Sequence, residues 1–226
     1  MRALFRLLLA LALLAPTLAA ARPTLEQRLA RLAPDLNREV LALALQARQC
    51  AGAARGERLA IIDYSRPSTE RRLWVFDLRR PRLLYREYVA HGRGSGDNYA
   101  TQFSNVSGSY QSSLGLFRTA DTYQGGNGYT LRLDGMDPGF NDLARARAIV
   151  MHGAAYVDPH LAQTQGRLGR SLGCPALRPQ IAREIIDTLR DGQWLFAYYP
   201  DATWLKRAAS LSCTSTHTRM AVNAVP

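Results

Sequence analysis

The chain has 226 residues and a formal charge of +11 at neutral pH, and nearly all of its basic residues are arginine. This length suits one domain with a substantial core, and no internal repeat or linker divides it. The arginines are spread along the chain, so the charge suits an anionic polymer or a membrane surface, or simply a solvated surface encoded by an arginine-biased genome. No nucleic-acid motif is found, and we expect no nucleic-acid partner.

Residues 1–21 predict export. Arg2 and Arg6 precede an apolar run at 7–14, Pro16 breaks the run, and three alanines at 19–21 offer a cleavage site. The run is too short to span a bilayer, so we expect a cleaved signal peptide and no stable membrane insertion afterwards. An uncleaved anchor is the alternative. Cleavage leaves a mature chain that starts near Arg22 and carries +9.

Apolar residues at helical spacing predict two helices, at 24–32 and 35–49, with Thr24 and Asp35 as N-caps. We assign residues 22–56 to an N-terminal helical extension. From Leu59 the period becomes that of strands, and one further helix is predicted at 179–190. The predicted strands are 59–64, 73–78, 82–90, 115–123, 129–133, 147–151 and 194–199.

Six or seven short strands with only a few helices predict a mainly β domain, a sandwich or an open barrel, over residues 57–200. Long helices do not alternate with the strands, which disfavours a parallel βαβ sheet. Residues 201–226 lack clear periodicity and are expected to form a loosely held tail.

One cysteine and one histidine stand out as a candidate catalytic pair. Cys174 lies in the Gly-rich stretch GRLGRSLGCPALR at 166–178, and His152 follows the strand predicted at 147–151. A histidine at hydrogen-bond range favours the reactive thiolate. Gly173 lets backbone N–H groups face the site, where they can stabilise an oxyanion. The alternative is a buried cysteine near a satisfied histidine.

Other chemistries are disfavoured. Cys174, His152 and His160 could supply three zinc ligands, but no regular ligand spacing is present. The glycines at 91–97 do not match a phosphate-binding loop, and no G-x-S-x-G elbow occurs. We expect no metal or cofactor, and we place His91 and His217 on the surface.

The remaining cysteines suggest a disulfide. An exported protein lies where disulfides form, and an odd count of three leaves one thiol over. Because Cys174 is needed as the nucleophile, we predict a bond between Cys50 and Cys213.

From Asp63 to Tyr198 the chain resembles the murein L,D-transpeptidase catalytic family, of the YkuD type. These enzymes share a His-Gly at a strand end and a Ser-x-Gly-Cys loop, which read here as His152-Gly153 and Ser171-Leu172-Gly173-Cys174. The chain is most similar to a branch with a longer signature, here GRSLGCPA at 169–176. Leu172 stands where the usual enzymes have histidine.

The resemblance implies that Cys174 is the nucleophile, that His152 is the general base and then acid, and that the Gly153 carbonyl orients the imidazole. Backbone N–H groups of Gly173 and Cys174 would form the oxyanion hole. Arg170 is expected to bind a peptide carboxylate or to pin the loop through a salt bridge. The other expected groove residues are Ser171, Ser104, Asn105 and Tyr123.

The implied function is that of an exported cysteine acyltransferase acting on peptidoglycan stem peptides in the periplasm or cell envelope of a bacterium. An amine that resolves the thioester makes the protein an L,D-transpeptidase, and water makes it an L,D-carboxypeptidase. Two alternatives remain: a catalytically silent wall-binding protein of the same fold, and a hydrolase of non-murein peptides.

Overall fold

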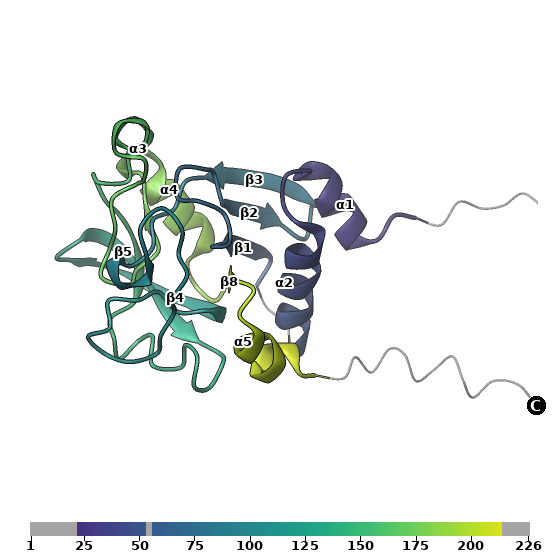
Figure 1. The fold of residues 1–226 in the computed structure, drawn as a ribbon. Coiled ribbons are helices and arrows are strands. Elements are labelled where there is room, and N and C mark those ends of the chain that lie inside the picture. The colour runs from purple at the N-terminus through teal and green to yellow at the C-terminus, as the bar shows by residue number, and fades with distance from the viewer. Residues whose placement is uncertain (1–21, 53–55, 214–226) are drawn as a thin grey trace, which may run out of the picture.

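A computed structural model describes residues 22–52 and 56–213 (Figure 1). The predicted signal peptide and His217 lie outside the described residues. The described part forms one eight-stranded sheet with the strand order β3-β2-β1-β8-β4-β5-β6-β7. Its strands are β1 Arg58–Asp63, β2 Leu73–Asp77, β3 Arg82–Glu87, β4 Gly115–Gly125, β5 Gly128–Gly135, β6 Val150–Gly153, β7 Ala176–Leu177 and β8 Trp194–Tyr198.

The sheet is mixed and nearly closed. β1 runs parallel to β8, and β6 runs parallel to β7, while the other neighbours are antiparallel. Ala90, just after the edge strand β3, forms a bridge with Ala176 in the opposite edge strand β7. The two edges therefore approach each other, and the prediction of a mainly β, barrel-like fold is confirmed.

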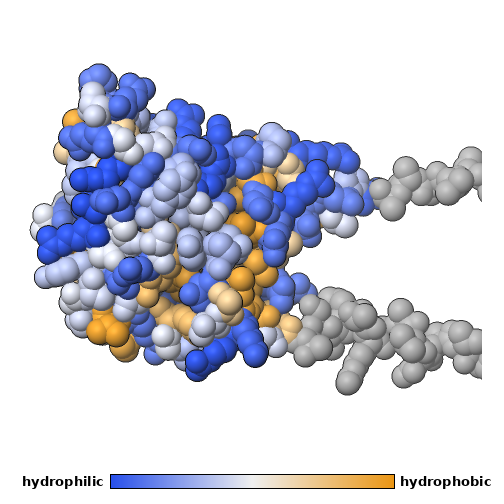
Figure 2. All heavy atoms as spheres, in the orientation of Figure 1, coloured by the Kyte–Doolittle hydropathy of each residue, from blue (hydrophilic) through white to orange (hydrophobic). Residues whose placement is uncertain are grey.

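Five helices accompany the sheet. They are α1 Leu25–Leu32, α2 Arg38–Cys50, α3 Pro159–Gln165, α4 Pro179–Leu189 and α5 Ala202–Arg207, with short 3-10 turns η1 Arg93–Ser95 and η2 Ala209–Leu211. α2 contacts β1, β4 and β8, and α4 contacts β1, β5 and β6. These central strands are buried nearly throughout, because helices or loops cover both of their faces. Hydrophobic residues gather where α2 and α5 meet the rest of the fold, on an otherwise hydrophilic face (Figure 2).

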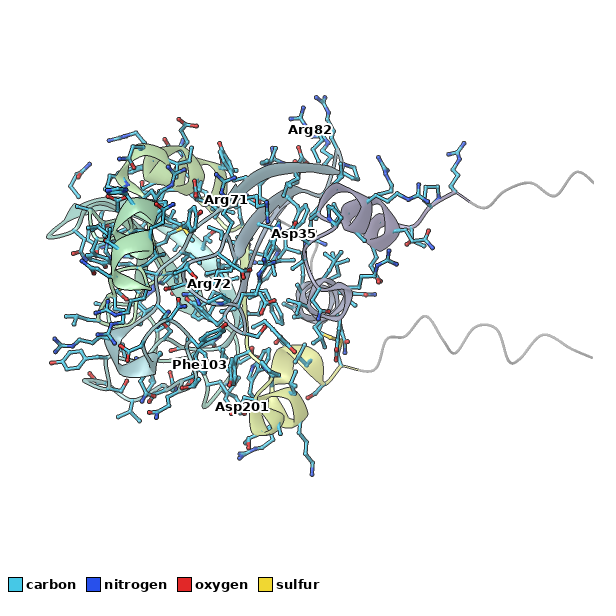
Figure 3. The ribbon with its side chains drawn as sticks, turned by 45° about the horizontal axis from the view of Figure 1, so that its top comes forward. Asp35, Arg71, Arg72, Arg82, Phe103 and Asp201 are labelled. Atoms are coloured by element: carbon cyan, nitrogen blue, oxygen red, sulfur yellow. A yellow bond between two sulfur atoms is a disulfide. The ribbon has the colours of Figure 1, made fainter. Side chains whose placement is uncertain are left out.

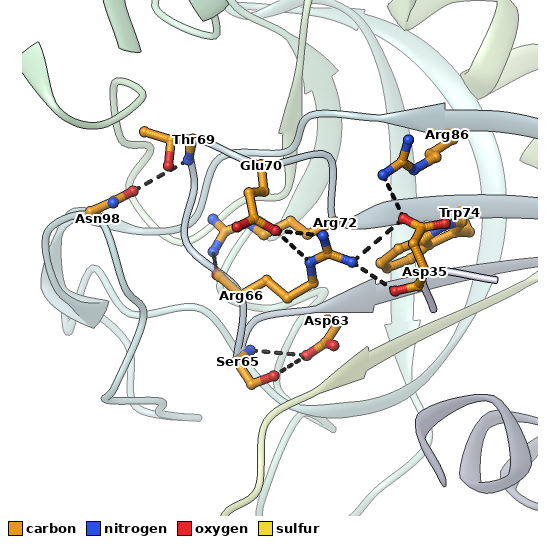
Figure 4. Close-up of polar contacts among 10 residues, drawn as sticks. All are labelled: Asp35, Asp63, Ser65, Arg66, Thr69, Glu70, Arg72, Trp74, Arg86 and Asn98. Atoms are coloured by element: carbon orange, nitrogen blue, oxygen red, sulfur yellow. Dashed lines mark hydrogen bonds and ion pairs between the residues drawn. The ribbon is translucent and has the colours of Figure 1, made fainter. Parts of the chain in front are cut away.

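The second helix begins later than predicted. Asn37, not Asp35, caps α2 by accepting a hydrogen bond from the Glu39 N–H. Asp35 instead forms an ion pair with Arg86 of β3 at 2.6 Å and lies 3.5 Å from Arg66, as Figure 4 shows. The carboxylate therefore joins the linker between α1 and α2 to the sheet. Thr24 does cap α1 as predicted, in a reciprocal capping box.

The prediction of a loosely held tail after Pro200 is wrong for residues 201–213. α5 is capped by Asp201 and buries Trp204 completely. Ser210 then donates from both its N–H and its hydroxyl to the buried carboxylate of Asp137. The predicted disulfide between Cys50 and Cys213 is present, with Cα atoms 5.5 Å apart. The segment lacks periodicity because it is short, and a few tertiary contacts hold it.

The described helices were also compared with the dimensions of a bilayer. None of them combines the length and the apolar composition needed to cross one.

Candidate active site

The candidate catalytic pair faces one cavity. A cavity of about 320 Å³ is lined by Cys174 and His152, with Arg147, Tyr156 and Arg170 among its other walls. β6 carries His152, which is paired in parallel register with Ala176 of β7. Cys174 lies two residues before Ala176, so the β6–β7 pairing brings the thiol and the imidazole to the same cavity across 22 residues of sequence.

The thiol of Cys174 is buried, with 8% of the residue exposed. Its Sγ accepts a hydrogen bond from the Val150 N–H at 3.5 Å and donates to the Ala148 carbonyl at 3.7 Å. Burial raises the pKa of Cys174, and the Val150 N–H and the nearby Arg147 guanidinium partly oppose this by favouring the thiolate. In the resting geometry the thiol is therefore protonated and directed at backbone groups.

The imidazole of His152 is oriented by its own backbone neighbour. Nδ1 donates to the Gly153 carbonyl at 2.9 Å, the contact expected from the resemblance. This hydrogen bond leaves Nε2 as the unprotonated, basic nitrogen. Burial lowers the pKa of His152, which keeps the ring neutral. Among the described residues neither hydrogen bond of the thiol reaches this imidazole, so proton transfer requires the thiol to turn away from Ala148.

The loop before the nucleophile is held by its own serine. The Ser171 hydroxyl accepts from the Gly173 N–H at 3.1 Å and donates to the Cys174 carbonyl at 2.7 Å. Ser171 therefore shapes the loop, although it also lines the cavity. Of the two N–H groups expected in the oxyanion hole, that of Gly173 is already used. Within the described part of the chain the Cys174 N–H makes no hydrogen bond and is free for a substrate oxygen.

Gly173 has a backbone geometry that other residues adopt only with strain. Its φ is +126°, and a Cβ there would lie 2.8 Å from Ile149 Cδ1 and 2.9 Å from the Gln111 carbonyl oxygen. Glycine at this position thus lets the backbone turn sharply before the nucleophile.

Arg170 combines the two roles that the sequence left open. Its guanidinium donates to the Gly96 carbonyl at 2.9 Å and to Asp97 at 2.8 Å, which pins the loop. It also lines the Cys174 cavity, as does the exposed side chain of Leu172. The guanidinium can therefore still present positive charge to a carboxylate in that cavity.

Three expected groove residues lie elsewhere. Ser104 and Asn105 line a separate cavity of about 340 Å³, together with Phe103 and Asp201 beside α5 (Figure 3). Tyr123 lines a small cavity of about 80 Å³, where the Arg132 guanidinium stacks on its ring. The structure does not bring these three residues into the Cys174 cavity.

The structure adds two cavity residues that received no role from the sequence, Arg147 and Tyr156. Tyr156 stands in the His152 signature, so the motif itself could have pointed to it. Arg147 had no such signal, because its four hydrogen bonds go to the 104–113 segment and depend on the tertiary fold. In the described ranges no group of three His, Cys, Asp or Glu residues could hold a metal ion.

The expected surface position of His91 is wrong. His91 is fully buried, and its Nδ1 lies 2.7 Å from the guanidinium of Arg72, which is also fully buried (Figure 3). Nδ1 accepts from this permanent donor, so Nε2 carries the proton and donates to the Gly96 carbonyl. Desolvation, with the charge of Arg72, lowers the pKa of His91 to about 3. The His91 carbonyl also accepts from the Ser171 N–H, so this buried pair supports the nucleophile loop.

A free thiol and an oriented imidazole in one cavity of a nearly closed sheet define a candidate cysteine–histidine site. The model of the L,D-transpeptidase catalytic domain family matches residues 32–198, which is most of the chain. The chain therefore belongs to the L,D-transpeptidase catalytic domain family, and the resemblance noted from its signature is confirmed.

Solved structures of similar proteins include an L,D-transpeptidase from Mycobacterium smegmatis, at 14% identity and a TM-score of 0.40, covering 63% of this chain and 59% of that one. Mycobacterium tuberculosis L,D-transpeptidase 1 is 12% identical with a TM-score of 0.36, covering 63% and 62%. An L,D-transpeptidase from Stackebrandtia nassauensis is 14% identical with a TM-score of 0.37, covering 79% and 90%. The chain thus spans less than two thirds of the first two structures. No curated protein matches it.

Proposed function

We propose that this protein is an exported cysteine acyltransferase that acts on peptidoglycan stem peptides, with Cys174 as its nucleophile. The observation that carries the proposal is that Cys174 and His152 line one cavity, with the imidazole oriented by the Gly153 carbonyl. Family membership supplies the substrate class. The cavity walls include two arginines, Arg147 and Arg170, which suits a peptide that ends in a carboxylate.

The first step is acylation. Nε2 of His152 takes the thiol proton, and Sγ of Cys174 attacks the carbonyl carbon of the L-centre that precedes a terminal D-amino acid. The carbonyl oxygen becomes an oxyanion, which the free Cys174 N–H can stabilise. The C–N bond then breaks, the imidazolium protonates the leaving amine, and a thioester remains on Sγ.

The second step resolves the thioester. An amine from a neighbouring stem attacks the same carbonyl while His152 takes its proton, the C–S bond breaks, and the thiol is restored. The product is a crosslink. If water takes the place of the amine, the same steps give a shortened stem and the protein is an L,D-carboxypeptidase.

Export to the periplasm or cell envelope is part of the proposal. The signal-like residues 1–21 support it, and so does the disulfide between Cys50 and Cys213, because such bonds persist in oxidising compartments. N-terminal sequencing of the protein recovered from the envelope should find a start near Arg22. A protein recovered intact from the cytosol would contradict export.

The activity is tested by incubating the mature protein with defined tetrapeptide-bearing muropeptides and analysing the products by mass spectrometry. New dimers indicate transfer, and shortened stems indicate hydrolysis. Cys174→Ala and His152→Gln should abolish either product, whereas His160→Gln, an exposed histidine on α3, should not. If muropeptides stay unchanged and a carbapenem leaves Cys174 unmodified, the protein is a silent member of the family and the proposal fails.

A further inference from the structure

A buried serine outside the signature touches the backbone of the nucleophile loop. The Ser112 hydroxyl donates to the Gly173 carbonyl at 3.0 Å and accepts from the Gly92 N–H at 3.0 Å. Only 1% of Ser112 is exposed, so water does not compete for these hydrogen bonds. This hydroxyl therefore links the Gly92 and Cys174 loops from behind the site.

The carbonyl that Ser112 holds belongs to the same peptide unit as the Cys174 N–H. The peptide bond is planar and trans, and the described chain contains no cis bond, so this C=O and this N–H point in opposite directions. Anchoring the Gly173 oxygen on one side of the plane fixes the direction of the Cys174 N–H on the other. That N–H is the remaining free donor of the expected oxyanion hole, because the Gly173 N–H is bound to Ser171.

The packing around Ser112 leaves this anchor little freedom. Its own N–H donates to the Ser95 hydroxyl at 2.9 Å. The backbones of Gly92 and Gly173 approach so closely that a Cβ on Gly92 would lie 2.8 Å from the Gly173 Cα. A small side chain that both donates and accepts fits between these loops, and a hydroxyl meets both needs.

We propose that Ser112 is a positioning residue that orients the Gly173–Cys174 peptide so that the Cys174 N–H receives the oxyanion. The inference rests on the proposed function, since it concerns an acyl-transfer step at Cys174. Without the hydroxyl, the Gly173 carbonyl loses its partner and the peptide plane is free to rotate. Removal of one oxyanion donor costs about 10²–10³ in rate, and we expect loss of its orientation to cost about 10²-fold.

The test compares two reactions of the same sulfur atom. Acylation by a carbapenem passes through a tetrahedral oxyanion, whereas alkylation by iodoacetamide displaces iodide at a saturated carbon and forms none. Both second-order rates are measured by mass spectrometry at one pH on the full mature protein, without reductant. Cys174 is the free cysteine under these conditions.

Ser112→Ala is the test variant, and Ser112→Thr keeps the hydroxyl. The matched control is Thr119→Val, since the Thr119 hydroxyl is also buried and also both donates to and accepts from backbone, at Gln193. Thr119 lies on β4 and outside the walls of the Cys174 cavity.

We expect Ser112→Ala to lower the acylation rate about 10²-fold with little change in alkylation, while Ser112→Thr and Thr119→Val keep the parental ratio of the two rates. If Ser112→Ala lowers both rates equally, or neither, the inference is wrong and the proposed function stands. If the parent protein is alkylated at Cys174 but never acylated, the proposed function fails and the inference fails with it.

Discussion

The buried pair of His91 and Arg72 leads to a prediction about stability and pH. In the folded protein the imidazole is neutral, because it accepts from the Arg72 guanidinium and no water reaches it. Arg170 lies close enough to oppose its protonation further. Unfolding releases the ring to water, where it binds a proton below about pH 6.5. His91→Asn removes this titration and keeps an acceptor oxygen for Arg72.

The magnitude follows from the pKa of His91, which is about 3 in the folded protein against an ordinary value of 6.5. The folded pKa is the lower one, so the unfolded state binds more protons and stability falls as the pH drops below 6.5. Between pH 7.5 and pH 5 the contribution to the free energy of unfolding changes by about 2 kcal/mol. His152, whose pKa burial also lowers, adds to the slope in the same direction in both proteins.

The assay is urea unfolding followed by tryptophan fluorescence at several pH values from 7.5 to 5. The difference in free energy of unfolding between the parent and His91→Asn should shrink by about 2 kcal/mol over that range. His160→Asn, which removes an exposed histidine, is the matched control. A difference that stays constant with pH would refute the reasoning, because it would mean that His91 takes up its proton without cost in the folded protein.

Three further predictions concern the cysteines and the C-terminal helix. Replacing Cys50 and Cys213 by serine should lower the free energy of unfolding by up to about 5 kcal/mol on the chain-entropy model, because the bond joins residues 163 apart in sequence. Trp204→Ala should lower it by about 3–5 kcal/mol, since Trp204 is fully buried. The rate of alkylation of Cys174 by iodoacetamide should keep rising past pH 9, because burial raises the pKa of the thiol above that ordinary value.

Each of these predictions can fail in a definite way. Unchanged urea midpoints in the serine double variant or in Trp204→Ala would mean that residues 201–213 do not contribute to the cooperative fold. A plateau of the alkylation rate below pH 8 would mean that Cys174 already exists as a thiolate in an ion pair, contrary to its hydrogen bond to the Ala148 carbonyl.

Local periodicity predicted the elements that local interactions hold. The helix predicted at 179–190 is α4, Pro179–Leu189, with its apolar face on the sheet. The strand predicted at 194–199 is β8, Trp194–Tyr198. Both are strongly patterned segments, in which the side chains to be buried repeat at the period of the backbone.

Elements that depend on distant partners were missed. β7 has only two residues, Ala176–Leu177, and exists because β6 pairs with it. The six-residue helix α5 is too short for a periodic signal and is held by the burial of Trp204. Ser104 and Asn105 were placed in the groove from their place in a matching stretch, yet the chain carries them to another cavity.

The sequence by itself determined the family, the mainly β class and the cysteine that stays free, because these follow from residue types and their order along the chain. Only the tertiary structure decided that His91 is buried against Arg72, that the Gly173 N–H is occupied, and that Ser112 holds the nucleophile loop. The physical reason is that burial and the orientation of a peptide plane are set by groups many residues away, such as the 61 residues that separate Ser112 from Gly173.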